Sequence, residues 1–462
     1  MCSKSSGRAP KPFFRSTRRG FLTGCSAAIA SLAGARFGQV AFAGTPGAND
    51  EILVVVFLRG GMDGLNFVMP LGGGDRAAYE AARPDIRVPT SGSNAARVLQ
   101  GNFGIHGSAG ALQDLFQDGK LAVIHAAGLS EANRSHFDAM KFMELGTPGE
   151  GKTKTGWLHR HMSSATNLPS DIVMPSLSVG SLQATSLLGS SESLNMSSVG
   201  DFSLNVGPYQ WRPAVRTAMR NILQRGDSWL HQTGVQALDA LDIVELSAGG
   251  NYTPANGAVY PGGSLGDHLE LVAQMVKLDL GLRVATIDFG GWDTHNGQGD
   301  SGGGFFADRV RTLADSLAAF YLDLDGQGAQ SYTSRLTVVV MSEFGRRLRQ
   351  NADRGTDHGH GNVMMVLSGN AIGGIHGQWP GLANGQLFDG ADLQVTTDYR
   401  RVLSEVLIRR MGNPNLGEIF PDYSGYSPMG IVQGTDLTPV LGASIFSDGF
   451  DSGNTGRWSS VV

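Results

Sequence analysis

The chain has 462 residues, 41% of them hydrophobic and 17% charged, a composition typical of a globular protein with one large domain or two smaller ones. No apolar run reaches the roughly 18 residues that would predict a membrane span. Acidic side chains outnumber basic ones, 41 against 36, which argues against nucleic acid as a partner.

The first 43 residues have the features of an export signal and not of a folded domain. The pair Arg18-Arg19 precedes a modest apolar segment at 27–33, and Ala41-Phe42-Ala43 offers small residues for cleavage. This pattern resembles a twin-arginine signal, so we expect the twin-arginine export machinery as a partner and a periplasmic or secreted protein. Lipidation at Cys25 is the alternative, but there the apolar segment follows the cysteine instead of preceding it.

Removal of this segment changes the charge and the cysteine content of the chain. It holds seven of the 36 basic residues and no acidic one, so 29 basic side chains remain against 41 acidic ones and the net charge becomes −12. Both cysteines, Cys2 and Cys25, leave with it. The mature protein therefore has no thiol for a disulfide or for nucleophilic catalysis.

The mature chain from 44 to 440 has the alternating pattern of an α/β domain. Short apolar runs predict buried strands, and amphipathic spacing predicts helices between them. Residues 163–263, rich in Ser, Gly, Asn and Pro, are expected to form a cap-like insertion, and 441–462 a flexible tail. In chain order we expect strands at 52–58, 121–125, 282–287, 336–341 and 363–367, and helices at 109–117, from about 135, within 215–238, at 269–280, at 305–321 and at 396–411.

Four of these strands run into turns that carry metal-binding or nucleophilic side chains. Asp63 follows the first strand, Ser135 the second, Asp293 and His295 the third, and Glu343 the fourth. In an open α/β sheet, ligands gather at the carboxyl ends of the strands. Carboxylates and imidazoles are the donor types for a divalent metal of the Zn or Mn class. The recurrence predicts one shared site, with a capping or turn role as the alternative for Asp63.

Three further candidates lie in the polar loop before the last strand, and Ser135 itself has two interpretations. These candidates are Asp357, His358 and His360. They are either metal ligands or parts of a polar turn whose side chains hydrogen-bond one another. Ser135 opens a predicted helix, where the helix dipole favours a nucleophilic alkoxide or a bound anion. Ser is also among the commonest N-cap residues, so a structural role stays open.

The segments FLRGGMDGLN, NRSHF, FGGWDTHN, SEFGR and GTDHGHG, in this order over about residues 50–410, resemble the bacterial DUF1501 family. That family is similar to the alkaline phosphatase and sulfatase superfamily. The resemblance implies a three-layer αβα sandwich with a mostly parallel central sheet. It also implies Ser135 as nucleophile and metal ligands at Asp63, Asp293, His295, Glu343 and His358 or His360, with Asp357 beside them.

The chain departs from the superfamily pattern at two places. One residue separates Asp293 from His295, where the superfamily pair is spaced by three. Glu343-Phe344-Gly345 stands where the superfamily has Asp-His-Gly. Asp357-His358-Gly359 spells that motif, but the polar stretch before it is not predicted to be a strand.

The function implied is an exported metal-dependent hydrolase of phosphate or related sulfate or phosphonate esters, acting on a small-molecule or envelope-derived substrate. One or two divalent ions, Zn or Mn, would activate Ser135 or a water. Arg59, Arg134 or Arg346 would clamp the non-reacting oxygens. A formylglycine sulfatase is disfavoured because the mature chain has no cysteine. The alternative is a non-catalytic secreted or cell-envelope binding or scaffold protein that keeps the fold.

Overall fold

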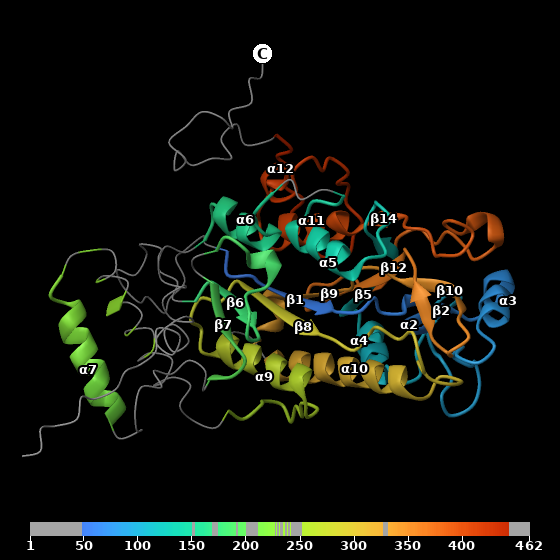
Figure 1. The fold of residues 1–462 in the computed structure, drawn as a ribbon, viewed down its shortest axis with the longest axis horizontal. Coiled ribbons are helices and arrows are strands. Elements are labelled where there is room, and N and C mark those ends of the chain that lie inside the picture. The colour runs from blue at the N-terminus through green and yellow to red at the C-terminus, as the bar shows by residue number, and fades with distance from the viewer. Residues whose placement is uncertain are drawn as a thin grey trace, which may run out of the picture.

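A mixed α/β fold with a mostly parallel central sheet is confirmed by the computed structural model of the chain (Figure 1). The described residues are 49–149, 153–168, 174–190, 193–199, 211–226, 252–326 and 331–442, with a few single positions between 228 and 241. The predicted export signal and the tail beyond 442 lie outside them. Within the described residues, no helix is both long enough and apolar enough to span a bilayer.

The central sheet has nine strands in the order β13-β5-β12-β9-β1-β8-β6-β7, with β14 paired to β5. Within the described part of the sheet, β12 alone runs antiparallel to its neighbours. The start of β12 therefore meets the carboxyl ends of β1, β5, β8 and β9 at one edge. The strands are β1 Ile52–Leu58, β5 Leu121–Gly128, β6 Ser176–Val179, β7 Ser193–Met196, β8 Val284–Phe289, β9 Leu336–Met341, β12 Asn362–Ser368, β13 Gly374–His376 and β14 Thr397–Asp398.

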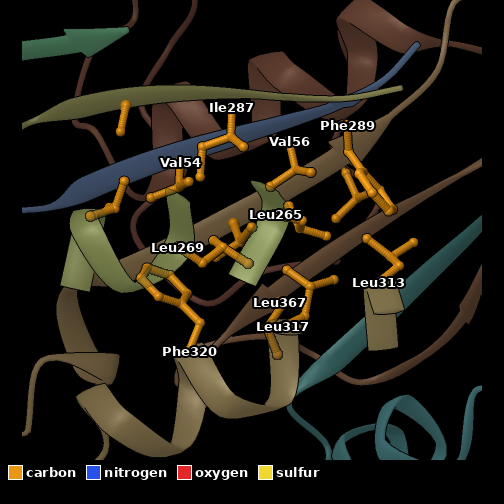
Figure 2. Packing of buried hydrophobic residues seen from close by; sticks show 14 of the residues in the cluster. Val54, Val56, Leu265, Leu269, Ile287, Phe289, Leu313, Leu317, Phe320 and Leu367 are labelled. Atoms are coloured by element: carbon orange, nitrogen blue, oxygen red, sulfur yellow. The ribbon is translucent and has the colours of Figure 1, made fainter. Parts of the chain in front are cut away.

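Helices cover both faces of this sheet, as the alternating side chains of β1 require (Figure 1). Ile52, Val54 and Val56 pack against α4, α9 and α10, whereas Leu53, Val55 and Phe57 pack against α5, α6, α11 and α12. Figure 2 shows the first of these cores, in which Leu265 and Leu269 of α9 and Leu313, Leu317 and Phe320 of α10 meet β1 and β8. The helices are α4 Gly110–Gln117, α5 His136–Leu145, α6 Trp157–Ser164, α9 Ser264–Lys277, α10 Phe305–Leu324, α11 Tyr399–Arg409 and α12 Leu416–Ile419.

Smaller elements lie around the sheet. A three-stranded sheet and a two-stranded ribbon accompany short helices, and α7 occupies the range in which one helix was expected. These elements are α2 Gly64–Phe67, β2 Val68–Pro70, α3 Gly73–Ala82, β3 Arg97–Gln100, β4 Phe103–Ile105, α7 Arg212–Leu223, β10 Arg346–Gln350 and β11 Thr356–His358, with single 3-10 turns at Thr185–Leu187, Thr333–Arg335 and Asn384–Gln386.

The structure holds several elements that the sequence did not predict, among them β11 and the strands β6 and β7. Asp357 and His358 lie in the strand β11, which pairs with β10 as an antiparallel ribbon; its polar side chains give none of the apolar periodicity that predicted the other strands. Strands β6 and β7 fall inside the range 163–263, yet both extend the central sheet beyond β8. Part of the expected insertion is thus part of the sheet.

A buried histidine on β5 provides a test of this packing. His125 is 3% exposed and lies between the rings of Phe103 and Trp379, at centroid distances of 4.3 Å and 5.0 Å. Burial lowers the pKa of His125 from 6.5 to about 4. His125 therefore binds a proton more readily in the unfolded chain than in the folded one. The contribution of the neutral, buried His125 to stability is present above pH 6.5 and is lost as the pH falls toward 4.

We expect His125→Phe to weaken the acid sensitivity of folding. Between pH 7 and pH 5, the free energy of unfolding should fall by about 2 kcal/mol less in the variant than in the wild type. Chemical denaturation at the two pH values measures this difference. Equal losses in both proteins would contradict the buried, neutral state of His125.

Candidate metal centre

Three histidines from separate parts of the chain meet at the carboxyl edge of the sheet, and each is held from behind by an oxygen acceptor. His136 Nδ1 lies 2.7 Å from Glu343 Oε1, His358 Nδ1 lies 2.8 Å from the carbonyl oxygen of Arg134, and His295 Nδ1 lies 3.2 Å from Asp357 Oδ1. A carbonyl or carboxylate oxygen can only accept, so each Nδ1 carries the proton. In the neutral imidazole, each Nε2 is then left with a free lone pair.

The three Nε2 atoms surround one carboxylate oxygen. They lie 3.6 Å (His136), 3.3 Å (His295) and 3.8 Å (His358) from Asp293 Oδ1. Ligands of a tetrahedral zinc ion lie about 3.3 Å apart, given metal–ligand bonds of about 2.0–2.1 Å. The ligand atoms of His136, Asp293 and His358 all lie within 4.8 Å of one another, which fits a divalent ion held by two imidazoles and one carboxylate, a donor set suited to Zn or Mn. His295 lies beside this group.

Two observations favour a cation among these atoms. The Nε2 atoms of His295 and His358 lie only 2.8 Å apart, and two facing lone pairs repel each other unless a proton or a metal ion lies between them. His136 Nε2 is buried and has no hydrogen-bond partner among the described residues. A buried nitrogen without a partner is costly, and metal coordination would satisfy it.

The carboxylate of Glu343 links the strands around the centre. It is fully buried at the end of β9 and accepts hydrogen bonds from His136, from the backbone N–H of Gly60 and from the hydroxyl of Ser342. Burial alone would raise the pKa of Glu343, but these hydrogen bonds outweigh it and the pKa lies below its ordinary value. Glu343 is therefore ionised near neutral pH and fixes the orientation of His136.

Asp293 is positioned by a buried guanidinium. Arg346 donates to Asp293 Oδ1 at 2.7 Å and to the carbonyl oxygens of Gly61 and Thr356, both also at 2.7 Å. Burial would raise the pKa of Asp293, and the bond from Arg346 instead brings it below the usual value. Gly60 permits the close approach of this segment: its φ is +118°, and an added Cβ would lie 2.5 Å from the backbone nitrogen of Asp293.

The structure brings five of the predicted site residues together. Asp293, His295 and His358 contribute the converging atoms, while Glu343 and Asp357 hold histidines. Burial lowers the pKa of His358, which keeps its imidazole in the neutral form that binds metals. The pKa of Asp357 is also lowered, first by its hydrogen bond from Asn351 and then by His295.

Asp63 lies in a different environment. It is fully buried, and Arg83 donates to both of its oxygens, at 2.6 Å and 3.0 Å. Gln298 donates to the same carboxylate at 2.6 Å. The negative charge of Asp63 is thus matched by the guanidinium of Arg83, the residue that follows α3. Asp63 therefore forms a buried ion pair and does not belong to the converging group.

The remaining predicted residues have partners of their own. Ser135 is exposed and caps α5, where its Oγ accepts from the backbone N–H of Asp138 at 3.4 Å. Arg134 pairs with Asp392 and Asp389. Arg346 makes the contacts with Asp293, Gly61 and Thr356 that are described above. His360 is buried against Phe388 at a centroid distance of 4.4 Å, and burial lowers its pKa to about 4.

His136 is the member of the centre that the sequence did not predict. His136 comes directly after Ser135, at the first position of α5. Ser135 is the N-cap of that helix, and the sequence patterns predict a role only for the serine there. The signal was present in NRSHF, since a histidine next to a helix start at a strand end has the same donor chemistry as His295 and His358. Its partner Glu343 lies 207 residues away, a pairing that no local pattern reveals.

Comparisons with known proteins give one family model and a distant structural neighbour. Among solved structures, the lipoteichoic acid synthase LtaP from Listeria monocytogenes is similar over 88% of this chain and 79% of its own, with 9% identity and a TM-score of 0.30, which is too distant to assign an activity. No curated protein matches the chain. Residues 269–417, which include Asp293, His295, Glu343 and His358, match the family model described as "Protein of unknown function (DUF1501)". The match covers 149 of the 462 residues, and over that range it agrees with the family that the sequence motifs resemble.

Proposed function

We propose that this chain is an exported metal-dependent hydrolase of phosphate or related sulfate or phosphonate esters. The observation that carries the proposal is the convergence of three Nε2 atoms on Asp293 Oδ1, each imidazole being held from behind by an oxygen acceptor. A divalent ion bound there would lower the pKa of a water molecule and stabilise negative charge on the transferred group. Export is inferred from the Arg18-Arg19 motif.

One ion fits the centre better than two. His136, His358 and Asp293 would hold it, with His295 beside them, whereas Asp63, the first ligand that the resemblance implied, is neutralised by Arg83. The side chains of Asp293 and His295 are 50% and 39% exposed, so the centre is open to solvent and to a substrate on that side. Three protein ligands would leave the fourth position of a tetrahedral ion for a water or a substrate, as in catalytic zinc sites.

Water is the nucleophile that we propose, with Ser135 as the alternative. The Ser135 hydroxyl is engaged as the cap of α5. The proton of an attacking water has acceptors nearby, because the carboxylates of Asp293 and Asp357 are both half exposed and both ionised near neutral pH. Arg346 orients Asp293 and has its own donors committed to backbone oxygens, so it acts by positioning.

A secreted binding or scaffold protein with a structural metal is the second candidate. The ion pair of Arg83 with Asp63 favours it, since it occupies one of the carboxylates that the superfamily resemblance assigned to metal binding. The two candidates differ in one measurable property. A scaffold would bind the ion and hydrolyse no ester.

The central test compares His136→Ala with Ser135→Ala in hydrolysis of 4-nitrophenyl phosphate and bis(4-nitrophenyl) phosphate after loading with Zn or Mn. We expect His136→Ala to lower kcat/KM at least about 100-fold, because a ligand is removed. Ser135→Ala should keep kcat/KM within about tenfold of the wild type and lower stability by about 1 kcal/mol, the usual effect of a lost cap.

His376→Ala is the matched control, because it removes a histidine of β13 whose ring bonds the carbonyl oxygen of Ile372. It should leave activity unchanged. Loss of activity in Ser135→Ala with the fold intact would make Ser135 the nucleophile. Metal-loaded wild-type protein that cleaves no ester of a broad panel would leave the scaffold as the better explanation.

Glu343→Gln tests the support of the centre separately from its ligands. The variant keeps the size of the side chain and removes the charge that orients His136, so we expect metal affinity to fall by about 10–100-fold. Asp357→Asn should have a smaller effect, because the Asp357 side chain is 51% exposed and water screens its contact. Chelator competition measures both affinities. An unchanged affinity in Glu343→Gln would contradict the positioning role.

A further inference from the structure

An open groove lies beside the candidate metal centre and belongs to none of the contacts described so far. Its volume is about 490 Å³, within the range of small-molecule sites. One wall is the first part of α5 with Phe137 and Met140, and the other is the loop after β6 with Leu182. Arg59 and Asp288, at the ends of β1 and β8, lie between these walls.

The groove and the metal centre are built from the same segments. Phe137 directly follows His136, and Arg59 directly precedes Gly60, whose N–H binds Glu343. Asp288 lies in β8, and the turn after that strand carries Asp293. A molecule bound with one end at the centre would therefore have its other end within reach of the groove.

The charges in the groove balance. Arg59 pairs with Glu144 at 2.8 Å and with Asp288 at 2.9 Å, so its guanidinium is engaged by two carboxylates. Lys141 supplies the second positive charge, and burial lowers the pKa of His268, which keeps that ring neutral. Two positive and two negative side chains leave no net charge to attract a polyanion such as a nucleotide.

The walls present apolar side chains to solvent. Phe137 is 86% exposed and Leu182 is 81% exposed, and both line the groove. Large apolar side chains gathered on a concave surface are typical of ligand sites, whereas isolated ones are ordinary. The lining also holds uncharged polar side chains, among them Ser178, Gln183 and Thr286, so the part of the groove suited to an uncharged, apolar group is the one around Phe137, Met140 and Leu182.

We propose that the groove binds the apolar alcohol part of the ester whose acid part is held at the metal centre. This inference rests on the proposed function and adds the substrate class, namely esters of an aromatic or aliphatic alcohol and not nucleotides or sugar phosphates. Phe137, Met140 and Leu182 contact the alcohol part, and the paired Arg59 closes the floor of the groove.

Equilibrium binding to the metal-loaded full chain tests the proposal with three probes: 1-naphthyl phosphate, inorganic phosphate and 1-naphthol. The variant is Leu182→Asp, which changes an exposed loop side chain that the metal centre does not use. Val259→Asp is the matched control, since Val259 is 80% exposed and does not line the groove.

We expect the wild type to bind 1-naphthyl phosphate at least about tenfold more tightly than inorganic phosphate, as an apolar contact of this size provides. Leu182→Asp should remove that advantage and weaken 1-naphthol binding to the same extent. Inorganic phosphate should bind equally to all three proteins, and Val259→Asp should match the wild type throughout.

The outcomes separate this inference from the proposed function. A wild-type protein that does not bind 1-naphthol, or a Leu182→Asp variant that binds it unchanged, overturns the groove as an alcohol site. If 1-naphthol binds and the variant loses it while neither phosphate probe binds, the groove stands as an apolar site and the proposed phosphoester chemistry fails.

Discussion

The buried hydrogen bond between Glu343 and His136 is the interaction on which the rest of the site depends. Glu343 has no exposed surface, yet its oxygens connect the loop after β1, the start of α5 and the end of β9. A buried carboxylate is stable only when its oxygens accept hydrogen bonds, and here they accept from a backbone N–H and from an imidazole. The same bond selects the tautomer in which His136 Nε2 faces the centre.

The antiparallel strand β12 makes this meeting of segments possible. In an all-parallel sheet, the residues before a strand lie at the amino edge, away from the carboxyl ends of its neighbours. Because β12 is reversed between β5 and β9, the ribbon that leads into it brings His358 and Asp357 to the edge where β1, β8 and β9 end. Arg346, at the start of the ribbon, adds the charge that fixes Asp293.

Sequence patterns predicted five of the nine strands of the central sheet and most of the centre, because these leave local signals. The five apolar runs correspond to β1, β5, β8, β9 and β12, and the turns after them hold Asp293, His295 and Glu343. Long-range pairing was beyond such patterns. Asp63 follows strand β1, whereas Arg83 follows helix α3, and only the fold shows that the two form an ion pair.

Short polar elements also escaped prediction. Strand β11 has no apolar alternation, so neither its strand character nor the different surroundings of His358 and His360 could be read from the chain. His358 faces Asp293, whereas His360, two residues later, packs on Phe388. Two histidines that are equivalent as sequence features therefore have separate roles, and they form a natural pair for experiment.

The metal content of purified protein, measured by elemental mass spectrometry for the wild type, His358→Gln and His360→Gln, tests the metal centre most directly. One equivalent of Zn, Mn or Fe in the wild type and in His360→Gln, with less than about a tenth of that in His358→Gln, is the expected result. Folded wild-type protein that holds no metal and takes up none when it is offered would contradict the centre. So would equal metal content in both variants.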